Sequence, residues 1–203
     1  GCDNGYHIGS PAIAPLQPVA AAFGQGFRVD SEGVILPRAG DRDARDSGQW
    51  GLALRWLGDE TEYGAYFMNY HSRTPIVSTQ NAGLATLAAL PGIIGTANGI
   101  VPGSGAGLAQ SVMLGNGRYY LEYPEDIRLY GMSFSTTLPT GTAWAGEVSY
   151  RPNLPLQINT TDMTLSLLNP IAPGAAPVAA GPGQDNVGYR RKEVTQVQTT
   201  FTH

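Results

Sequence analysis

Charged side chains on strand-like segments are the residues of this sequence best suited to do chemistry. Six of these charged residues lie between positions 122 and 151: Glu122, Glu125, Asp126, Arg128, Glu147 and Arg151. Carboxylates and guanidinium groups form strong, often bidentate pairs. Where such pairs line the water-filled interior of a β-sheet wall, they stiffen the wall or select charged solutes. We predict that Arg55, Arg128, Glu147 and Arg151 line such a lumen; plain stabilisation of the wall is the alternative role.

The signatures of common enzymes are missing. The three histidines, His7, His71 and His203, have no metal-binding spacing such as HExxH. The segment 102–107 (PGSGAG) has Pro102 where a nucleophile elbow needs its first glycine, and it lacks the lysine of a phosphate-binding loop. We therefore expect no enzyme and no cofactor. An enzyme of the cell envelope stays as the remote alternative, and it requires convergent titratable groups in a closed cleft.

Two further features receive a structural interpretation. The run 41–46 (DRDARD) spaces its carboxylates like part of a calcium loop, but the glycine and the distal glutamate of an EF-hand are missing. A solvated polar loop is expected there. The single cysteine, Cys2, cannot form a disulfide within this sequence. It is either a free thiol or the partner of a cysteine outside this sequence.

Composition narrows the class of protein. Charged residues make up 14% of the chain, against about 25% in ordinary soluble domains. The net charge is -4 and Lys192 is the only lysine, which argues against binding to a nucleic-acid backbone. Twenty-seven glycines and fifteen prolines argue against a helical bundle. The chain therefore has fewer charged side chains than an ordinary soluble domain uses to keep its surface hydrated.

The elements that must position these side chains are strands. Residues 50–57 (WGLALRWL) alternate large apolar side chains with small or charged ones, and this period of two is typical of a strand with two different sides. Segments 61–72, 119–123, 126–138, 142–151 and 189–203 are read as further strands, with tight turns at 58–60 and 139–141. Several of these strands are longer than the usual five or six residues.

Long polar or small-residue segments separate the strands. We divide one partial domain, 1–203, into a loop region with at most one strand (1–48), a hairpin (49–73), a long loop (74–117), strands and a hairpin (118–152), a long loop (153–187) and a strand (188–203). No charged residue occurs from Thr74 to Gly117. Pro91 and several glycines argue against a transmembrane helix there, so we expect short helices at 82–90 and 106–114.

Short turns on one rim and long loops on the other are typical of outer-membrane barrels. The predicted fold class is therefore all-β: part of an antiparallel up-and-down outer-membrane β-barrel with long surface loops carrying short helices. Aromatic residues would form interfacial girdles, for which we select Trp50, Trp56, Tyr66, Tyr70, Trp144 and Tyr150. A soluble all-β domain is the alternative, and it requires Trp50, Leu52, Leu54 and Trp56 to be buried against a second sheet.

Four segments carry a resemblance to a known family: 41–51 (DRDARDSGQWG), 62–75 (EYGAYFMNYHSRTP), 122–135 (EYPEDIRLYGMSFS) and 146–152 (GEVSYRP). Together they resemble the proteobacterial domain of unknown function 1302 (DUF1302). The resemblance covers nearly the whole chain and is loosest in the charge-free loop. It implies that members are much longer outer-membrane barrels with a signal peptide, so this chain is expected to be an internal fragment.

Genes of this family often lie near a second uncharacterised envelope family and exporter-like membrane proteins. The resemblance therefore implies trafficking of hydrophobic or lipid-like compounds across the cell outer membrane. Membrane lipid, a hydrophobic small molecule and other envelope transport proteins are the expected partners, and no nucleic acid is expected. A surface-exposed or soluble all-β binding or structural module without transport activity is the alternative function. The resemblance supplies no catalytic residues.

Overall fold

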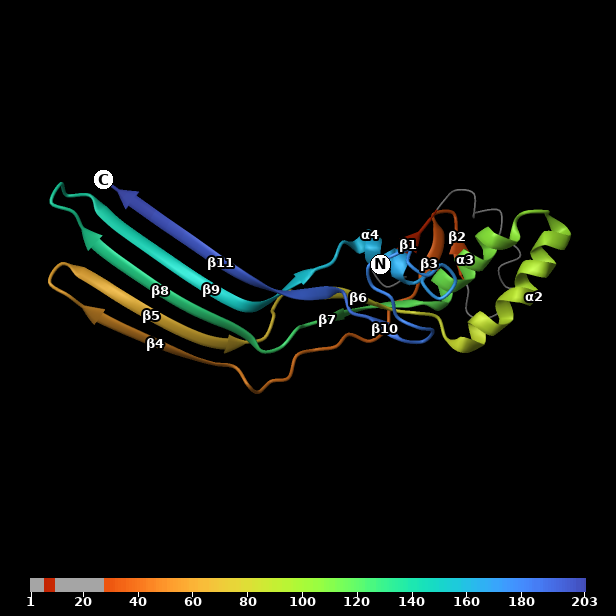
Figure 1. Cartoon of the computed structure of the whole chain (residues 1–203), viewed down its shortest axis with the longest axis horizontal. Coiled ribbons are helices and arrows are strands. Elements are labelled where there is room, and N and C mark those ends of the chain that lie inside the picture. Colours follow the sequence, from red (N-terminus) through yellow and green to blue (C-terminus); the bar gives the residue numbers. More distant parts are fainter. Residues whose placement is uncertain (1–5, 10–27) are drawn as a thin grey trace. The chain divides into compact units, whose positions relative to one another are not determined.

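The computed structural model describes residues 6–9 and 28–203, so Cys2 lies outside the described residues. The described chain is mostly β, with antiparallel sheets and three helices (Figure 1). It divides into two compact units whose segments alternate along the sequence. Unit 1 contains residues 1–42, 77–122 and 157–188, and unit 2 contains residues 43–76, 123–156 and 189–203.

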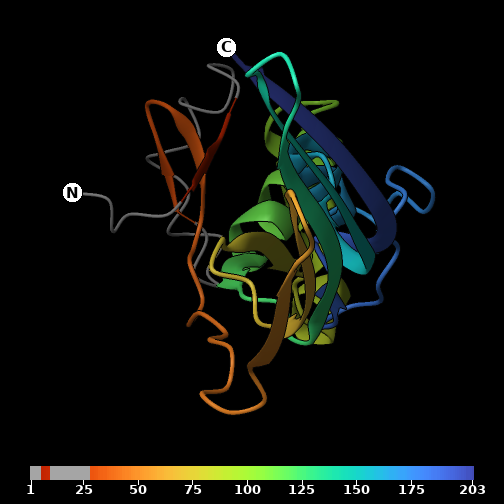
Figure 2. The ribbon, with the colours of Figure 1, turned by 90° about the vertical axis from the view of Figure 1, so that its left-hand side faces the viewer.

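Unit 2 is built on one five-stranded antiparallel sheet with strand order β11-β9-β8-β5-β4. Its strands are β4 (Trp50–Leu57), β5 (Thr61–Tyr70), β8 (Ile127–Thr137), β9 (Ala143–Gln157) and β11 (Tyr189–Thr202). Short turns join β4 to β5 and β8 to β9, and Figure 2 views the strands from these turn ends. The five strands predicted for this part of the sequence are confirmed, although β9 runs six residues beyond the expected Arg151.

Unit 1 contains two three-stranded sheets. In the first, β3 (Gly33–Leu36) lies between β1 (Tyr6–Ile8) and β2 (Val29–Asp30); in the second, β6 (Ile76–Gln80) lies between β10 (Asp185–Asn186) and β7 (Arg118–Glu122). The expectation of at most one strand before residue 48 was wrong. These strands are only two to four residues long, too short for the period of two to be recognised.

A tight turn joins β2 to β3. The Asp30 side chain accepts hydrogen bonds from the backbone N–H groups of Glu32 and Gly33. Gly33 has φ 136°, which L-residues rarely adopt, and a Cβ there would lie 2.4 Å from the Cα of Gly9. Only glycine therefore allows β1 and β3 to pair so closely at this point.

The helices also belong to unit 1: α2 (Leu84–Ile100), α3 (Gly105–Asn116) and α4 (Thr160–Ser166). The helix expected at 106–114 is confirmed as α3. The helix expected to end at Leu90 was wrong in its extent, because α2 continues through Pro91 to Ile100. A proline inside a helix costs about 3 kcal/mol; the burial of Leu90 and Ala97 on either side of it offsets this cost.

Helix α4 was not expected from the sequence. The Asn159 side chain caps it by accepting a 2.8 Å hydrogen bond from the backbone N–H of Thr161. Its seven residues include only two buried side chains, Met163 and Ser166, which is too few to give a helical period. None of the described helices has the length and apolarity needed to span a membrane.

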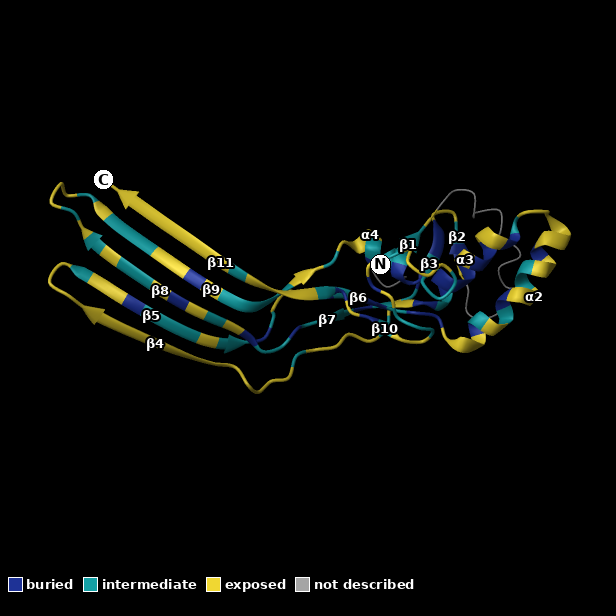
Figure 3. Ribbon diagram, in the orientation of Figure 1, coloured by how far each residue is buried: buried dark blue, intermediate teal, exposed yellow. Residues whose placement is uncertain are grey.

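The hydrophobic core lies in unit 1. It joins Val34 and Leu36 of β3 to Leu108, Val112 and Met113 of α3. Leu167, which follows α4, completes this core and is fully buried. Figure 3 shows the contrast with unit 2, where β4 and β11 are exposed over nearly their whole lengths. Unit 1 thus has an interior of its own, while the sheet of unit 2 leaves large side chains open.

Leu167→Ala is expected to lower the free energy of unfolding of unit 1 by about 2–5 kcal/mol, the usual cost of such a cavity. The matched control is Leu84→Ala on α2, where the leucine is 70% exposed. Denaturant unfolding followed by backbone amide exchange measures both variants. The account of the core is contradicted if the two substitutions have equal effects on the amides of α3.

Candidate functional site

The register of the unit 2 sheet divides its side chains strictly between two faces. Directly paired residues point to the same side of a sheet. One row runs through Leu54, Ala65, Met132 and Val148; the next row on the same face runs through Leu52, Phe67, Tyr130 and Tyr150. We call this side the apolar face. Three of its other members are Trp50, Trp56 and Trp144, so all three tryptophans of the sequence share it.

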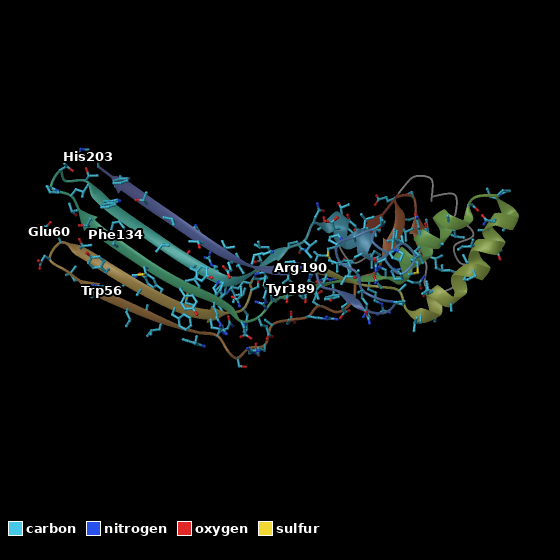
Figure 4. The ribbon with its side chains drawn as sticks, viewed as in Figure 1. Trp56, Glu60, Phe134, Tyr189, Arg190 and His203 are labelled. Carbon is cyan, nitrogen blue, oxygen red and sulfur yellow. The ribbon has the colours of Figure 1, made fainter. Side chains whose placement is uncertain are left out.

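Aromatic rings gather at both ends of the apolar face. Near the turns, Trp56 stacks on Tyr63, and Trp144 contacts both Phe134 and Phe201. At the opposite end, Phe67 contacts both Trp50 and Tyr130. Figure 4 marks Trp56 and Phe134 near the turn end of the sheet, with Tyr189 and Arg190 at the start of β11. Aliphatic side chains lie between these two aromatic clusters.

One glycine makes room for the ring cluster near the turns. Gly146 lies directly opposite Phe134, and a Cβ at Gly146 would be 2.4 Å from the Phe134 ring. The ring therefore covers the glycine backbone, an arrangement that shields a weak strand residue. The Phe134 ring in turn meets Trp144 in a T-shaped contact, with centroids 4.7 Å apart.

The apolar face is open to its surroundings. Trp50, Leu52 and Leu54 are each 55% exposed, Met132 is 59% exposed and Phe201 is 61% exposed. The soluble alternative required the Trp50–Trp56 face of β4 to be buried against a second sheet. Among the described residues of unit 2, no element covers it. Large apolar side chains, whose burial is the most favourable, thus stay about half exposed.

The opposite side, which we call the polar face, carries small and charged residues. A row across it runs Arg55, Gly64, Ser133 and Glu147. Arg55 lies 3.8 Å from Glu62 in an exposed ion pair, and the hydroxyls of Tyr66 and Ser133 are 3.3 Å apart. Strand alternation places Arg151 on this face as well.

Some of the predicted lumen charges and interfacial aromatics lie on the opposite face of the sheet from the other members of their set. Arg128 pairs with Asn69 and belongs to the apolar face, so it does not face Glu147, whose partner is Ser133. This register excludes a carboxylate–guanidinium pair between Arg128 and Glu147. Among the aromatic candidates, Tyr66 and Tyr70 lie on the polar face, whereas Trp50, Trp56, Trp144 and Tyr150 lie on the apolar face.

Two cavities open on the polar face. The first, about 300 Å³ in volume and near the turns, is lined by Arg55, Glu62, Tyr66, Ser133, Ser135 and Glu147 among others. The second, about 540 Å³, lies at the opposite end, where Met68, Ile127 and Leu129 supply apolar walls and Arg151 a charged one. Its apolar residues interrupt the polar pattern of this face, and alternation alone gave no sign that they form a cavity.

A hydrogen-bonded cluster fixes the end of the sheet away from the turns. Nδ1 of the buried His71 accepts from the backbone N–H of Asp126, and its Nε2 donates to the Ser47 carbonyl. These two bonds fix the tautomer of the ring. Arg45 pairs with Glu125 at 2.8 Å and with Asp126 at 2.6 Å. We call these residues the base cluster; they tie segment 45–49 to the start of β8.

The run 41–46 is exposed over most of its length, as expected of a solvated polar loop. One of its residues also makes long-range contacts, because Arg45 pairs with Glu125 and Asp126, which lie 80 and 81 positions away in the sequence. Asp126 itself has φ 56°, an unusual backbone angle for a residue other than glycine. The Asn69 amide and the Arg45 guanidinium bond to its carboxylate and hold the Asp126 pKa below the ordinary value.

Unit 1 has a second polar cluster. The Arg42 guanidinium lies 4.1 Å from the centre of the Tyr120 ring and 2.7 Å from the Asp185 carboxylate. Ser78 donates to Glu122 beside them. Burial, followed by the nearby acidic charges, raises the pKa of Tyr120 to about 12. Within residues 6–9 and 28–203, no group of three or more His, Cys, Asp or Glu side chains is arranged to hold a metal ion.

Residues 3–203 match the family described as protein of unknown function (DUF1302), so the chain belongs to this family. No curated protein and no solved structure matches the chain. The family resemblance seen in the sequence is confirmed.

Asp126→Asn is expected to lower the stability of unit 2 at neutral pH and to flatten its dependence on acid. A carboxyl group whose pKa is lower in the folded state than in the unfolded state, about 3.9, stabilises the folded protein at pH values above the unfolded pKa. This contribution to the free energy of unfolding is lost as the pH falls through the folded pKa. Urea midpoints followed by tryptophan fluorescence at pH 7 and below pH 4 measure this effect.

The matched control for this prediction is Asp59→Asn, in the turn between β4 and β5, where no ion pair with a described residue is formed. The control should keep the wild-type response to acid. Identical acid responses of wild type and Asp126→Asn would contradict the role given to the base cluster.

Proposed function

We propose that the unit 2 sheet of this DUF1302 member is part of the wall of an outer-membrane β-barrel. In this proposal the apolar face contacts lipid and the polar face lines a water-filled interior. The observation that carries it is the exposed apolar face: five long antiparallel strands present aromatic and aliphatic side chains that no described element of the unit covers.

Lipid explains this face better than water. Contiguous apolar patches beyond a few hundred Å² are uncommon on soluble monomers. Strands of transmembrane barrels alternate apolar-out with polar-in and carry aromatic girdles at both interfaces. Trp56 and Trp144 at one end, and Trp50 and Tyr150 toward the other, suit such girdles, while Tyr66 and Tyr70 on the polar face do not. Arg128 would lie at the edge of the lipid band, beside Asn69.

The strand edges must also be satisfied. β4 and β11 form the two edges of the sheet, and an unpaired backbone group in hydrocarbon costs several kcal/mol. The proposal therefore requires further strands beside β4 and β11, from the same protein or from other chains. Unit 1, with its own hydrophobic core, would lie outside the hydrocarbon.

The proposed activity is the passage or trafficking of hydrophobic or lipid-like compounds across the outer membrane. The polar face combines a polar cavity near the turns with a largely apolar cavity at the other end, so it offers sites both to water and to an apolar molecule. Membrane lipid, such a small molecule and other envelope transport proteins are the proposed partners. The proposal includes no catalysis and no cofactor.

Location and closure can be tested on the native protein. Inner and outer membranes are separated, and mobility in SDS gels is compared before and after boiling. A closed barrel is expected to be found in the outer membrane and to change its mobility on heating. Recovery in the soluble fraction without a mobility change would instead support a soluble all-β binding module.

Leu54→Arg and Ala53→Arg test the assignment of the two faces. The residues are neighbours on β4 and point to opposite sides. An arginine facing the lipid midplane costs about 2–4 kcal/mol, so Leu54→Arg should sharply reduce the heat-modifiable protein in the outer membrane. Ala53→Arg, facing the interior, should assemble close to wild type. Equal assembly of the two variants, or the reverse order, would count against the proposal.

A further inference from the structure

The larger cavity of the polar face has walls of two chemical kinds. Met68, Ile127, Leu129, Leu154 and Pro155 provide its apolar part. Arg73, Arg151 and the polar side chains of Tyr70, Ser72 and Thr74 provide its polar part. At about 540 Å³ it falls in the range of small-molecule sites, about 300–1,000 Å³.

The two arginines of this cavity have no acidic partner among the described residues. Neither Arg73 nor Arg151 forms an ion pair with a described residue, whereas Arg38, Arg42, Arg45 and Arg55 all do. None of the described residues that line the cavity is acidic. Two guanidinium groups beside an apolar pocket leave a local positive charge that no carboxylate of residues 6–9 and 28–203 neutralises through an ion pair.

An anion would satisfy this charge. Arginine binds carboxylate and phosphate strongly because its planar fork matches their oxygen atoms. The neighbouring hydroxyl groups of Thr74 and Tyr70 can donate further hydrogen bonds to the same group, whereas Ser72 donates its hydroxyl proton to the Thr74 carbonyl. The aliphatic walls formed by Met68, Ile127 and Leu129 suit an acyl or alkyl chain. The arginines and the apolar walls together suit a single ligand that has both an anionic head and an apolar chain.

We propose that this cavity binds a single-chain amphiphile with an anionic head, such as a long-chain carboxylate. Arg73 and Arg151 bind the head, and the walls at Met68, Ile127 and Leu129 bind the chain. This inference rests on the proposed function, in which the polar face lines the transport path, and it names the class of compound that passes. Neutral hydrocarbons and cationic amphiphiles would be poorer ligands.

Calorimetric titration of the native full-length protein tests this proposal, with the protein purified from whichever cell fraction contains it. The probes are hexadecanoate, hexadecanol and butyrate. Hexadecanoate should bind saturably, while the alcohol lacks the charge and butyrate lacks the chain. Arg73→Gln and Arg151→Gln should each weaken hexadecanoate binding about tenfold, the usual loss for one charge-assisted hydrogen bond.

Two further variants separate this site from general electrostatic attraction. Arg55→Gln removes an arginine from the same face but from the other cavity, and its Kd should stay within about twofold of wild type. Leu129→Trp fills the apolar part and should weaken hexadecanoate binding while both arginines stay. Each variant is first checked for wild-type mobility on heating, or for wild-type circular dichroism if the protein is soluble.

The proposal would be overturned if hexadecanoate does not bind saturably, if hexadecanol binds equally well, or if Arg151→Gln and Arg55→Gln have equal effects. Hexadecanoate binding is also measured with nanodiscs that contain phosphatidylglycerol and with nanodiscs of phosphatidylcholine alone. If only the phosphatidylglycerol nanodiscs block binding, the occupant is a phospholipid head, and the proposal of a single-chain amphiphile is overturned. Because binding is measured wherever the protein is located, a failure of binding is distinct from a failure of the outer-membrane proposal.

Discussion

The pairing register of the five-stranded sheet is the constraint on which the other features depend. Residues 62–69 of β5 each have fixed partners on both β4 and β8, and a shift by one residue would move every side chain to the other face. In the observed register, all three tryptophans lie on one face and Arg55, Glu147 and Arg151 on the other. The exposed apolar face, both cavities and the proposed function follow from this one alignment.

The base cluster holds this register at the end where no turn joins the strands. Tight turns connect β4 to β5 and β8 to β9, but the other ends of these strands lead into different segments. There the bonds of His71, Arg45 and Asp126 tie the chain before β4 to the chain before β8. The hydrogen bonds of the buried His71 are costly to break, and the more exposed ion pairs of Arg45 add a smaller contribution. The cluster therefore supports the face assignment without belonging to either face.

The sequence was sufficient where a pattern repeats over many residues. The period of two in 50–57 and 142–151 predicted both strands and the division of their side chains between faces. It could not predict that Arg128 lies opposite Asn69, because register is a long-range property. The short strands β1 and β2 and the seven-residue α4 carry too few residues for a period, and α2 continues through Pro91 because tertiary packing offsets the local cost. The cavity with Arg73 and Arg151 joins segments from four parts of the chain, which no local pattern reveals.

Contact between the apolar face and lipid can be measured most directly through the tryptophans. The native protein is reconstituted in bilayers with brominated acyl chains, and its fluorescence is compared with that of a variant in which Trp50, Trp56 and Trp144 are phenylalanine. If this face contacts lipid, bromine should quench the emission that these three residues contribute, while acrylamide dissolved in the water should quench it weakly. Strong quenching by acrylamide with no effect of bromine would contradict a lipid-facing sheet.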